Sequence, residues 1–280
     1  MSGPIKAVPL AIFLFFAPFA RGQTTTTTSG TAPRDATALA LAQASLKALA
    51  GTTTITDLTL NGSATYTAGG DEETGAVTLL ASGNLLSRVT LSLTDGQRTE
   101  IRNGPAGDWI GADAVEHSMA LHNCWPDAAW FYPGLSFQAL SADPGLGLGY
   151  VGLETKNGLS VQHLRLFRVV GGQSASISAT IQTLSAEDLY LDASSYLPLF
   201  LDFSLHPDND FNRSIPVEIV FSGYQNSAAV SSGSGIKFPA RLQKYLNGSL
   251  FLDLTIASAA VNSGLPASDF AVTDTTGGAQ

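Results

Sequence analysis

The first regular pattern along the chain is helical. Within residues 36–50, apolar residues recur at intervals of three and four, a spacing that places them on one stripe of an α-helix. The stripe residues are Leu39, Ala42, Leu46 and Leu49. Asp35 stands where an N-cap accepts a backbone hydrogen bond, and Gly51 stands where a left-handed C-cap is common. The pattern predicts one amphipathic helix, which has to pack against another apolar surface.

After this helix the apolar period shortens to two, which is typical of β-strands with one buried face. Residues 58–102 contain a series of such runs, separated by turn sequences such as Gly83-Asn84. In the last run the charged residues Arg98, Glu100 and Arg102 share one face of the strand. We expect a meander of antiparallel strands here.

Residues 113–142 break this alternation. Asp113 and Glu116 have capping-box spacing, and Pro126 and Pro133 each suit the first turn of a helix. We therefore expect two or three short helices in this insert, which is dense in large aromatic residues. These are Trp125, Trp130, Phe131, Tyr132 and Phe137. The insert is expected either to plug the sheet or to cap it.

Strand-like alternation resumes near Gly149 and continues to residue 259. In the runs 197–205 and 250–256 every second residue is Leu, Ile or Phe, so each run presents one whole face to a core. Segment 171–178 reads as a mobile loop. We predict a mainly β (α+β) fold: one large, curved antiparallel sheet, wrapped around helices that cover its concave face.

The N-terminus has the features of a secretory signal. An apolar run over residues 7–20 follows Lys6 and is shorter than the about 20 residues of a membrane-spanning helix. Ala20 and Gly22 place small residues where signal peptidase requires them, before Gln23. We predict a cleaved signal, with an uncleaved anchor as the alternative. The protein is therefore expected to be exported, to the periplasm or the extracellular space.

The chain divides into few parts. Residues 1–22 are the predicted signal peptide, and the polar residues 23–35 are expected to be a flexible leader. Residues 36–272 then form a single β domain that includes the helical insert, and residues 273–280 form a disordered tail.

Composition narrows the class of function. The net charge is −9, and it becomes −11 if Lys6 and Arg21 leave with the signal. The 14 Lys and Arg residues do not cluster, so the chain lacks the basic footprint with which proteins bind nucleic acid. Cys124 is the only cysteine, which excludes an intramolecular disulfide and predicts a buried apolar role for it.

Motifs for metal binding or catalysis are weak. His117, His122 and Cys124 lack the paired spacing of a structural zinc site. Ser234 lies in a Gly/Ser segment without the strand–turn–helix context of a serine nucleophile, and His163 lies inside a predicted strand. We therefore expect no metal, no cofactor and no catalytic site. A secreted hydrolase is kept as a third alternative.

A possible calcium loop is left open. Asp208, Asp210 and Asn212 alternate as they do at the start of an EF-hand loop. However, Arg213 and Ile219 stand where that loop needs glycine and glutamate. Asx residues beside a proline also form turns without any ion.

A series of short motifs follows between residues 185 and 272. It begins with YLDASSYLP at 190–198, and continues with FSGY at 221–224 and the proline-bearing IKFPARL at 236–242. A last strand ends in Val261-Asn262. In their order these motifs resemble the periplasmic lipoprotein-carrier (LolA-like) family.

The resemblance implies an unclosed β-barrel in which helices cover an apolar concave face. It also implies that the hollow holds acyl chains or senses lipoproteins. The insert 113–142 and the stretch 206–214 make this chain longer than a typical carrier. We therefore expect a non-enzymatic carrier or sensor of the bacterial cell envelope, acting as a monomer, with an acyl chain, a lipoprotein or an envelope protein as its partner.

A geometric argument indicates which residues line the hollow. A sheet of about ten strands leaves an apolar face too wide for the helix 36–50 to cover alone. The aromatic insert is therefore expected to place its side chains on helices that face the concave side. The predicted lining residues are Trp125, Trp130, Phe131, Phe137 and Leu46. The alternative is an envelope scaffold or protein-interaction module whose interior is filled.

Overall fold

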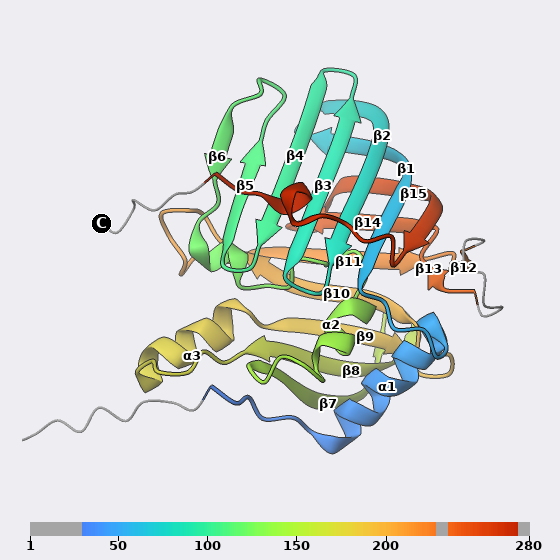
Figure 1. Cartoon of the computed structure of the whole chain (residues 1–280), viewed down its shortest axis with the longest axis vertical. Coiled ribbons are helices and arrows are strands. Elements are labelled where there is room, and N and C mark those ends of the chain that lie inside the picture. The colour runs from blue at the N-terminus through green and yellow to red at the C-terminus, as the bar shows by residue number, and fades with distance from the viewer. Residues whose placement is uncertain (1–29, 228–234, 274–280) are drawn as a thin grey trace, which may run out of the picture.

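The protein is represented by a computed structural model that describes residues 30–227 and 235–273 (Figure 1). Its helices are α1 (Ala36–Ala50), the 3-10 helix η1 (Leu121–Cys124), α2 (Gly134–Ala139), α3 (Ala175–Leu184) and the 3-10 helix η2 (Ala267–Phe270). Its strands are β1 (Asp57–Ala68), β2 (Asp71–Ser82), β3 (Leu86–Leu93), β4 (Gly96–Asn103), β5 (Ala106–Ile110), β6 (Glu116–Ser118), β7 (Leu146–Lys156), β8 (Leu159–Arg168), β9 (Glu187–Asp192), β10 (Pro198–Leu205), β11 (Ile215–Ser222), β12 (Gln225–Asn226), β13 (Lys237–Phe238), β14 (Arg241–Leu246) and β15 (Ser249–Val261).

Thirteen of the described strands form one antiparallel sheet, in the order β6-β5-β4-β3-β2-β1-β15-β14-β11-β10-β9-β8-β7. The sheet bends strongly but does not close, because β6 and β7 are both edge strands. In Figure 1 strands β1–β6 stand roughly upright and β7–β11 run across below them. Strand β1 pairs with β15, so the two ends of the domain meet in the middle of the sheet. The predicted mainly β fold with an unclosed, curved sheet is confirmed.

Helix α1 begins and ends where the sequence predicts. The Asp35 side chain accepts a hydrogen bond from the Ala38 N–H at 2.9 Å, and Gly51 follows the helix with a φ of 62°. A positive φ disfavours any residue with a β-carbon, so glycine suits this position. The buried face of α1, which includes Leu49, packs against α2 and β7.

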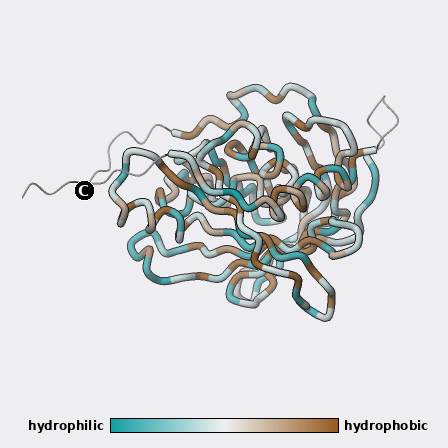
Figure 2. The backbone as a smooth tube through the Cα atoms, turned by 90° about the horizontal axis from the view of Figure 1, so that it is seen from below, coloured by the Kyte–Doolittle hydropathy of each residue, from teal (hydrophilic) through white to brown (hydrophobic). Residues whose placement is uncertain are grey.

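One hydrophobic core lies against the concave face of the sheet. It joins residues from both wings, among them Leu60 and Leu79 from the upright strands and Leu189 and Ile219 from the crossing ones. The insert adds Trp130, Phe131, Tyr132, Leu135 and Phe137. Figure 2 shows hydrophobic and hydrophilic positions alternating along much of the chain, as expected when one face of each strand packs on a core.

The C-terminal segment covers part of the opposite, convex face. Helix η2 packs against β3 and β4, and its Phe270 is fully buried. The Phe270 carbonyl oxygen accepts a hydrogen bond from Asn103 Nδ2 at 3.1 Å. Ile101, on the outer side of β4, is buried as well.

The insert 113–142 contains two short helices, as predicted, but it also contains a strand and much irregular chain. It contains strand β6, the 3-10 helix η1 and a single α-helix, α2. The prediction that Trp125, Trp130 and Phe131 lie on helices is wrong, because Trp125 lies in a bend and the other two lie in a turn between η1 and α2. Pro126 and Pro133 lack a backbone N–H and are disfavoured in the interior of a helix, which disfavours one continuous helix through this part of the insert.

Two other local predictions are wrong. The Asp113 carboxylate does not begin a capping box but accepts a hydrogen bond from the Val115 N–H at 3.1 Å, in a tight turn. Segment 171–178 is not a loop throughout, because its second half forms the start of α3. The Ser174 hydroxyl caps this helix by accepting a hydrogen bond from the Ile177 N–H at 3.4 Å, and serine is a common N-cap residue from which this helix start could have been predicted.

Residues 30–35, at the end of the predicted leader, pack beside β7. The Asp35 N–H donates to the Leu148 carbonyl at 2.8 Å, and the Leu148 N–H donates to the Pro33 carbonyl at 3.2 Å. The predicted signal peptide, the earlier part of the leader and the tail from residue 274 lie outside the described residues. Among the helices of the described part, none is long and apolar enough to cross a lipid bilayer.

The packing of the insert generates a stability prediction. Phe131 is fully buried at the centre of the core, so Phe131→Ala leaves a cavity that the surrounding sheet cannot fill. We expect a loss of about 3–5 kcal/mol in the free energy of unfolding, measured by urea denaturation.

Phe211 provides the matched control, because its side chain is 48% exposed. We expect Phe211→Ala to change the free energy of unfolding by about 0.5 kcal/mol or less. Equal losses in the two variants would show that the aromatic insert does not pack as described.

Candidate functional site

A cavity of about 1130 Å³ lies at the rim of the concave face. Its walls are the β2–β3 turn, the β4–β5 turn, helix α2 and the connection from β8 to α3. Much of its lining is apolar and includes Ile55, Leu135 and the half-buried Trp125. Because typical small-molecule sites measure about 300–1,000 Å³, this cavity is large enough for a ligand with a long chain.

The structure distributes the five predicted site residues over three places. Trp125 lines the rim cavity. Trp130 and Phe131 fill the hollow, where their rings meet edge to face with centroids 5.5 Å apart. Phe137 and Leu46 flank a smaller pocket of about 340 Å³ between α1 and α2. The five are not gathered around one space, and their role in ligand binding stays a prediction.

Helix α2, one wall of the rim cavity, is held in place by Gln138. The Gln138 Nε2 donates to the Ile55 carbonyl at 2.8 Å, and its Oε1 accepts from the Ile55 N–H at 2.9 Å. This pair of bonds joins α2 to the connection between α1 and β1. A helix of six residues is not stable by itself, so these contacts and its packing position the wall.

Arg34 holds the segment that follows α2. Its Nε donates to the Leu146 carbonyl at 2.9 Å, and its two terminal nitrogens donate to the carbonyls of Leu140 and Asp143. One guanidinium therefore gathers three carbonyls from the stretch that closes the rim cavity on one side. Arginine suits this task because its donors have a fixed planar geometry.

A buried ionic cluster fastens the insert to the rim. Asp127 Oδ1 accepts hydrogen bonds from Arg168 Nη2 at 2.7 Å and from Asn84 Nδ2 at 3.3 Å. Arg168 Nη1 also donates to Asp143 Oδ2 at 2.9 Å. Asp127 lies in the insert, two residues after Trp125. The cluster thereby connects the insert with the β2–β3 turn and the end of β8. Breaking one partner would leave a buried charge unpaired, which is strongly destabilising.

Glu187 lies beneath this cluster and is 3% exposed. Its Oε1 accepts a hydrogen bond from the Asp127 N–H at 2.5 Å. Burial and the nearby Asp127 charge raise the pKa of Glu187 to about 8, although that hydrogen bond and the Arg168 charge act in the opposite direction. At neutral pH the side chain is therefore largely protonated, which avoids a second buried negative charge.

The rim cavity has no recognisable catalytic set. Cys124 lines it, but burial raises the pKa of this thiol and so disfavours the nucleophilic thiolate. Within residues 30–227 and 235–273 no three His, Cys, Asp or Glu side chains converge as a metal site requires. In the possible calcium loop, Asp210 Oδ1 accepts a hydrogen bond from the Asn212 N–H at 3.1 Å, in a local turn.

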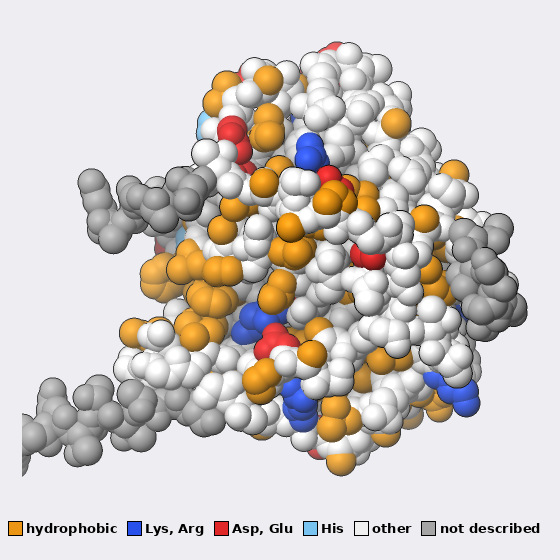
Figure 3. Space-filling model, viewed as in Figure 1, with side chains coloured by type: hydrophobic (Ala, Val, Ile, Leu, Met, Phe, Trp, Pro, Cys, Tyr) orange, Lys and Arg blue, Asp and Glu red, His pale blue; other side chains and the backbone are white. Residues whose placement is uncertain are grey.

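Figure 3 shows hydrophobic side chains spread among scattered charged ones on one face of the molecule.

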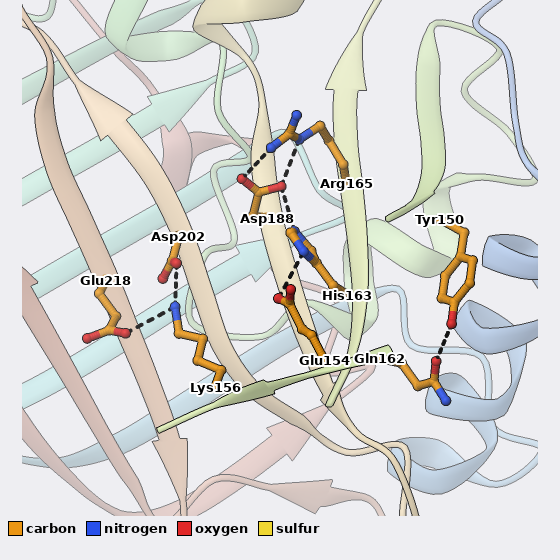
Figure 4. A network of polar contacts seen from close by, with 9 residues as sticks. All are labelled: Tyr150, Glu154, Lys156, Gln162, His163, Arg165, Asp188, Asp202 and Glu218. Atoms are coloured by element: carbon orange, nitrogen blue, oxygen red, sulfur yellow. Dashed lines mark hydrogen bonds and ion pairs between the residues drawn. The ribbon is translucent and has the colours of Figure 1, made fainter. Parts of the chain in front are cut away.

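A second polar network lies on the convex face, across β7 to β11 (Figure 4). Asp188 accepts from Arg165 Nε at 2.7 Å and lies 2.8 Å from His163 Nε2. Glu154 Oε1 lies 3.1 Å from the other ring nitrogen of His163. Burial raises the pKa of Asp188, but the hydrogen bonds from Arg165 and His163 outweigh it and lower the pKa overall.

The same network continues through Lys156. Its ammonium group pairs with Asp202 and, at 3.1 Å, with Glu218 Oε1, and it lies 4.2 Å from the centroid of the Tyr190 ring. The network thus pairs positive with negative groups on neighbouring strands. Its geometry fits a structural role, in which the end of β7 is held over the outer face of the sheet.

The residues that shape the rim cavity, among them Arg34, Gln138 and Arg168, were not among the predicted site residues. Each acts through contacts with residues far away in the chain, which no local pattern reports. One signal was available for Arg168, because a charged residue near the end of an apolar strand often has a buried partner.

No family model matches the sequence, and no curated protein matches it. Solved structures do match. A domain assigned as an outer membrane lipoprotein-sorting protein from Vibrio parahaemolyticus is 12% identical with a TM-score of 0.50, and the match covers 84% of this chain and 96% of that one. A LolA superfamily protein from Nitrosomonas europaea is 13% identical with a TM-score of 0.50, and the match covers 84% and 97%. A DUF1329 family protein from Desulfovibrio piger ATCC 29098 is 12% identical with a TM-score of 0.50, covering 84% and 96%.

At these identities the likeness establishes the fold. The chain has a LolA-like fold, and the resemblance predicted from the motifs between residues 185 and 272 is confirmed at that level.

The raised pKa of Glu187 generates a prediction about pH. The folded protein holds the Glu187 proton up to about pH 8, whereas the ordinary value is 4.5. The stabilisation of the folded state by protonated Glu187 is therefore complete below pH 4.5, and it is lost as the pH rises through 8. Relative to Glu187→Gln, the free energy of unfolding of the wild type should fall by up to about 1.4 kcal/mol per pH unit across this window.

Urea denaturation at several pH values measures the difference in the free energy of unfolding between the wild type and Glu187→Gln. Glutamine keeps the acceptor for the Asp127 N–H but cannot ionise, so Glu187→Gln should lack this pH dependence. Glu72→Gln is the control, because Glu72 is exposed and should give the wild-type curve. Parallel curves for the wild type and Glu187→Gln would contradict the proposed protonation of Glu187.

Proposed function

We propose that the protein is an exported, non-enzymatic carrier that binds an acyl chain, or the acylated end of a lipoprotein, in the rim cavity. The observation that carries this proposal is an open, mostly apolar cavity of about 1130 Å³ in a LolA-like fold. The carrier is expected to act as a monomer in the bacterial cell envelope.

Two further observations support the proposal. The N-terminal sequence has the features of a secretory signal, which fits a protein of the envelope. One structural neighbour is assigned to outer membrane lipoprotein sorting, and another belongs to the LolA superfamily.

The chemistry of the lining fits an apolar chain. Each methylene group moved from water into such a cavity contributes about 0.8 kcal/mol to binding. The charged groups at the border, Arg168 and Asp143, are paired with each other at 2.9 Å. The cavity therefore offers mainly apolar surface, and affinity should increase with chain length rather than depend on a charged head.

A second candidate is an envelope scaffold or protein-interaction module. It is favoured by the way Trp130 and Phe131 fill the hollow that the resemblance assigned to a ligand. It is also favoured by Leu121 and Phe211, which are 54% and 48% exposed and could contact a protein. The carrier proposal is preferred because the rim cavity remains open beside the filled hollow.

The test is Ala139→Phe, which places a ring in the rim cavity from the wall formed by α2. The fluorescent apolar probe N-phenyl-1-naphthylamine, displaced by palmitate, measures the binding. The wild type should bind the probe saturably. The variant should bind it at least about tenfold more weakly, equivalent to about 1.4 kcal/mol, because the space for the chain is occupied.

Ala179→Phe is the matched control, since Ala179 is an exposed residue of α3 outside the cavity lining. It should bind the probe as the wild type does, and unfolding in urea checks that both variants fold. The carrier proposal fails if the wild type shows no saturable binding. It fails also if both phenylalanine variants bind equally well, and a stable envelope protein partner without lipid would favour the scaffold.

A further inference from the structure

A second pocket, of about 160 Å³, lies in the concave hollow on the other side of the insert from the rim cavity. Strands β4 and β5 form one side, and strands β10 and β14 form the opposite side. The insert residues Asn123 and Trp130 also line it. Its volume is several times the about 30 Å³ that one water molecule occupies in the liquid.

Two cations face this pocket from positions where an apolar residue is expected. Arg102 lies opposite Ser87 on β3, in the row of concave-facing residues that includes Val89. Lys244 lies opposite Ile219 and Leu252, which both belong to the core. Cross-strand neighbours share one face of a sheet, so both charges point into the hollow. Placing a charge there costs free energy unless it is paired.

The two cations are only partly paired. Arg102 is 4% exposed, and its Nη2 donates to the Pro126 carbonyl at 3.0 Å, but its Nε has no hydrogen-bond partner. Lys244 is 9% exposed, and its ammonium lies 4.8 Å from the centroid of the Trp130 ring. Among the described residues this ammonium group has no salt-bridge or hydrogen-bond partner, whereas the Lys244 backbone belongs to the β14 ladders. The Trp130 indole Nε1 is also buried without an acceptor.

The acidic residues at the pocket do not complete these pairs. Glu100 Oε1 is 3.8 Å from Arg102 Nη1, which is long for a hydrogen bond. Asp127 is held by Arg168 through one oxygen, although its Oδ2 has no partner, and Asp208 is exposed. Glu100 can balance only one of the two cations. Arg102 and Lys244 together therefore keep one positive charge without a close counter-charge among the described residues.

We propose that this pocket binds an oxyanion, the carboxylate or phosphate group of a small ligand, with Lys244 and Arg102 as its cations and Trp130 as a neutral donor. The site is separate from the rim cavity and does not depend on the carrier function. The oxyanion is either a free anion or the acidic head of an amphiphile, since the chemistry of recognition is the same for both.

The electrostatics of Lys244 agree with this proposal. Burial and the charge of Arg102 lower the pKa of Lys244, and only Glu100 opposes them. A bound anion would stabilise the charged ammonium and raise this pKa again. Oxyanion binding should therefore be accompanied by proton uptake wherever the free amine is partly neutral.

Inorganic phosphate and acetate are the probes for the test, with ionic strength kept constant by chloride. Trp130 and Trp109 line the pocket, so tryptophan fluorescence reports on its occupation, and titration calorimetry measures the affinity. We expect saturable binding to the wild type and binding at least about tenfold weaker to Lys244→Met, which keeps the length of the side chain without its charge.

Lys47→Met is the matched control, because Lys47 is exposed on α1, and it should bind the oxyanion as the wild type does. Lys244→Arg should retain binding, which distinguishes a lost charge from lost packing. Octyl phosphate separates the two sources when it is measured with Ala139→Phe, in which the rim cavity is blocked: tighter binding than inorganic phosphate identifies an amphiphile head, and equal binding identifies a free anion.

The proposal is overturned if the wild type binds neither phosphate nor acetate saturably, or if Lys244→Met binds as tightly as the wild type. Displacement of N-phenyl-1-naphthylamine by palmitate is measured on the same samples. Because phosphate and acetate lack a long apolar chain, their binding does not depend on the rim cavity, so failure of the oxyanion site and failure of the carrier function can be told apart.

Discussion

A sheet that curves without closing has to have its concave face covered, and much of the described structure depends on this requirement. The inner side chains of thirteen strands form an apolar surface that a single helix such as α1 cannot shield from water. The aromatic residues of the insert supply the missing cover, with Phe131 and Tyr132 at its centre. Trp130, Phe131 and Tyr132 do so from irregular chain and Phe137 from helix α2, because the hollow can be filled by large side chains from either kind of backbone.

The cover is incomplete, and the remaining spaces differ in chemistry. At the rim, short turns and α2 surround an apolar cavity, held by Gln138 and Arg34 and by the pairing of Asp127 with Arg168. Inside the hollow, Arg102 and Lys244 border a small pocket that has charged as well as apolar residues in its walls. The insert lies between the rim cavity and this pocket. The residues that complete the core therefore also divide the remaining space into an apolar site and a site with charged residues.

The sequence predicted the parts of the fold that follow from local patterns. Alternation located most of the strands, and Asp35 and Gly51 located α1, because capping and periodicity act within a few residues. The insert was misjudged because its structure is decided by packing, which overrides capping signals such as Asp113. The alternating charges of β4 were recognised, but not that they point inward, since the register with β3 decides which face is buried. Trp125 lies at the rim cavity, where its role in ligand binding stays a prediction, whereas the positions of Trp130 and Phe131 depend on long-range contacts that no local pattern reports.

The most direct test of the account is to locate a bound acyl chain. Stearic acid with a nitroxide label near its methyl end can be added to the isotope-labelled protein, and the loss of amide signals in NMR spectra maps the position of the label. If the acyl chain binds in the rim cavity, selective broadening is expected at the residues that surround it, such as Leu85, Trp125 and Ala139. Broadening centred on the exposed residues Val151 and Leu153 of β7, or no selective broadening at all, would contradict it.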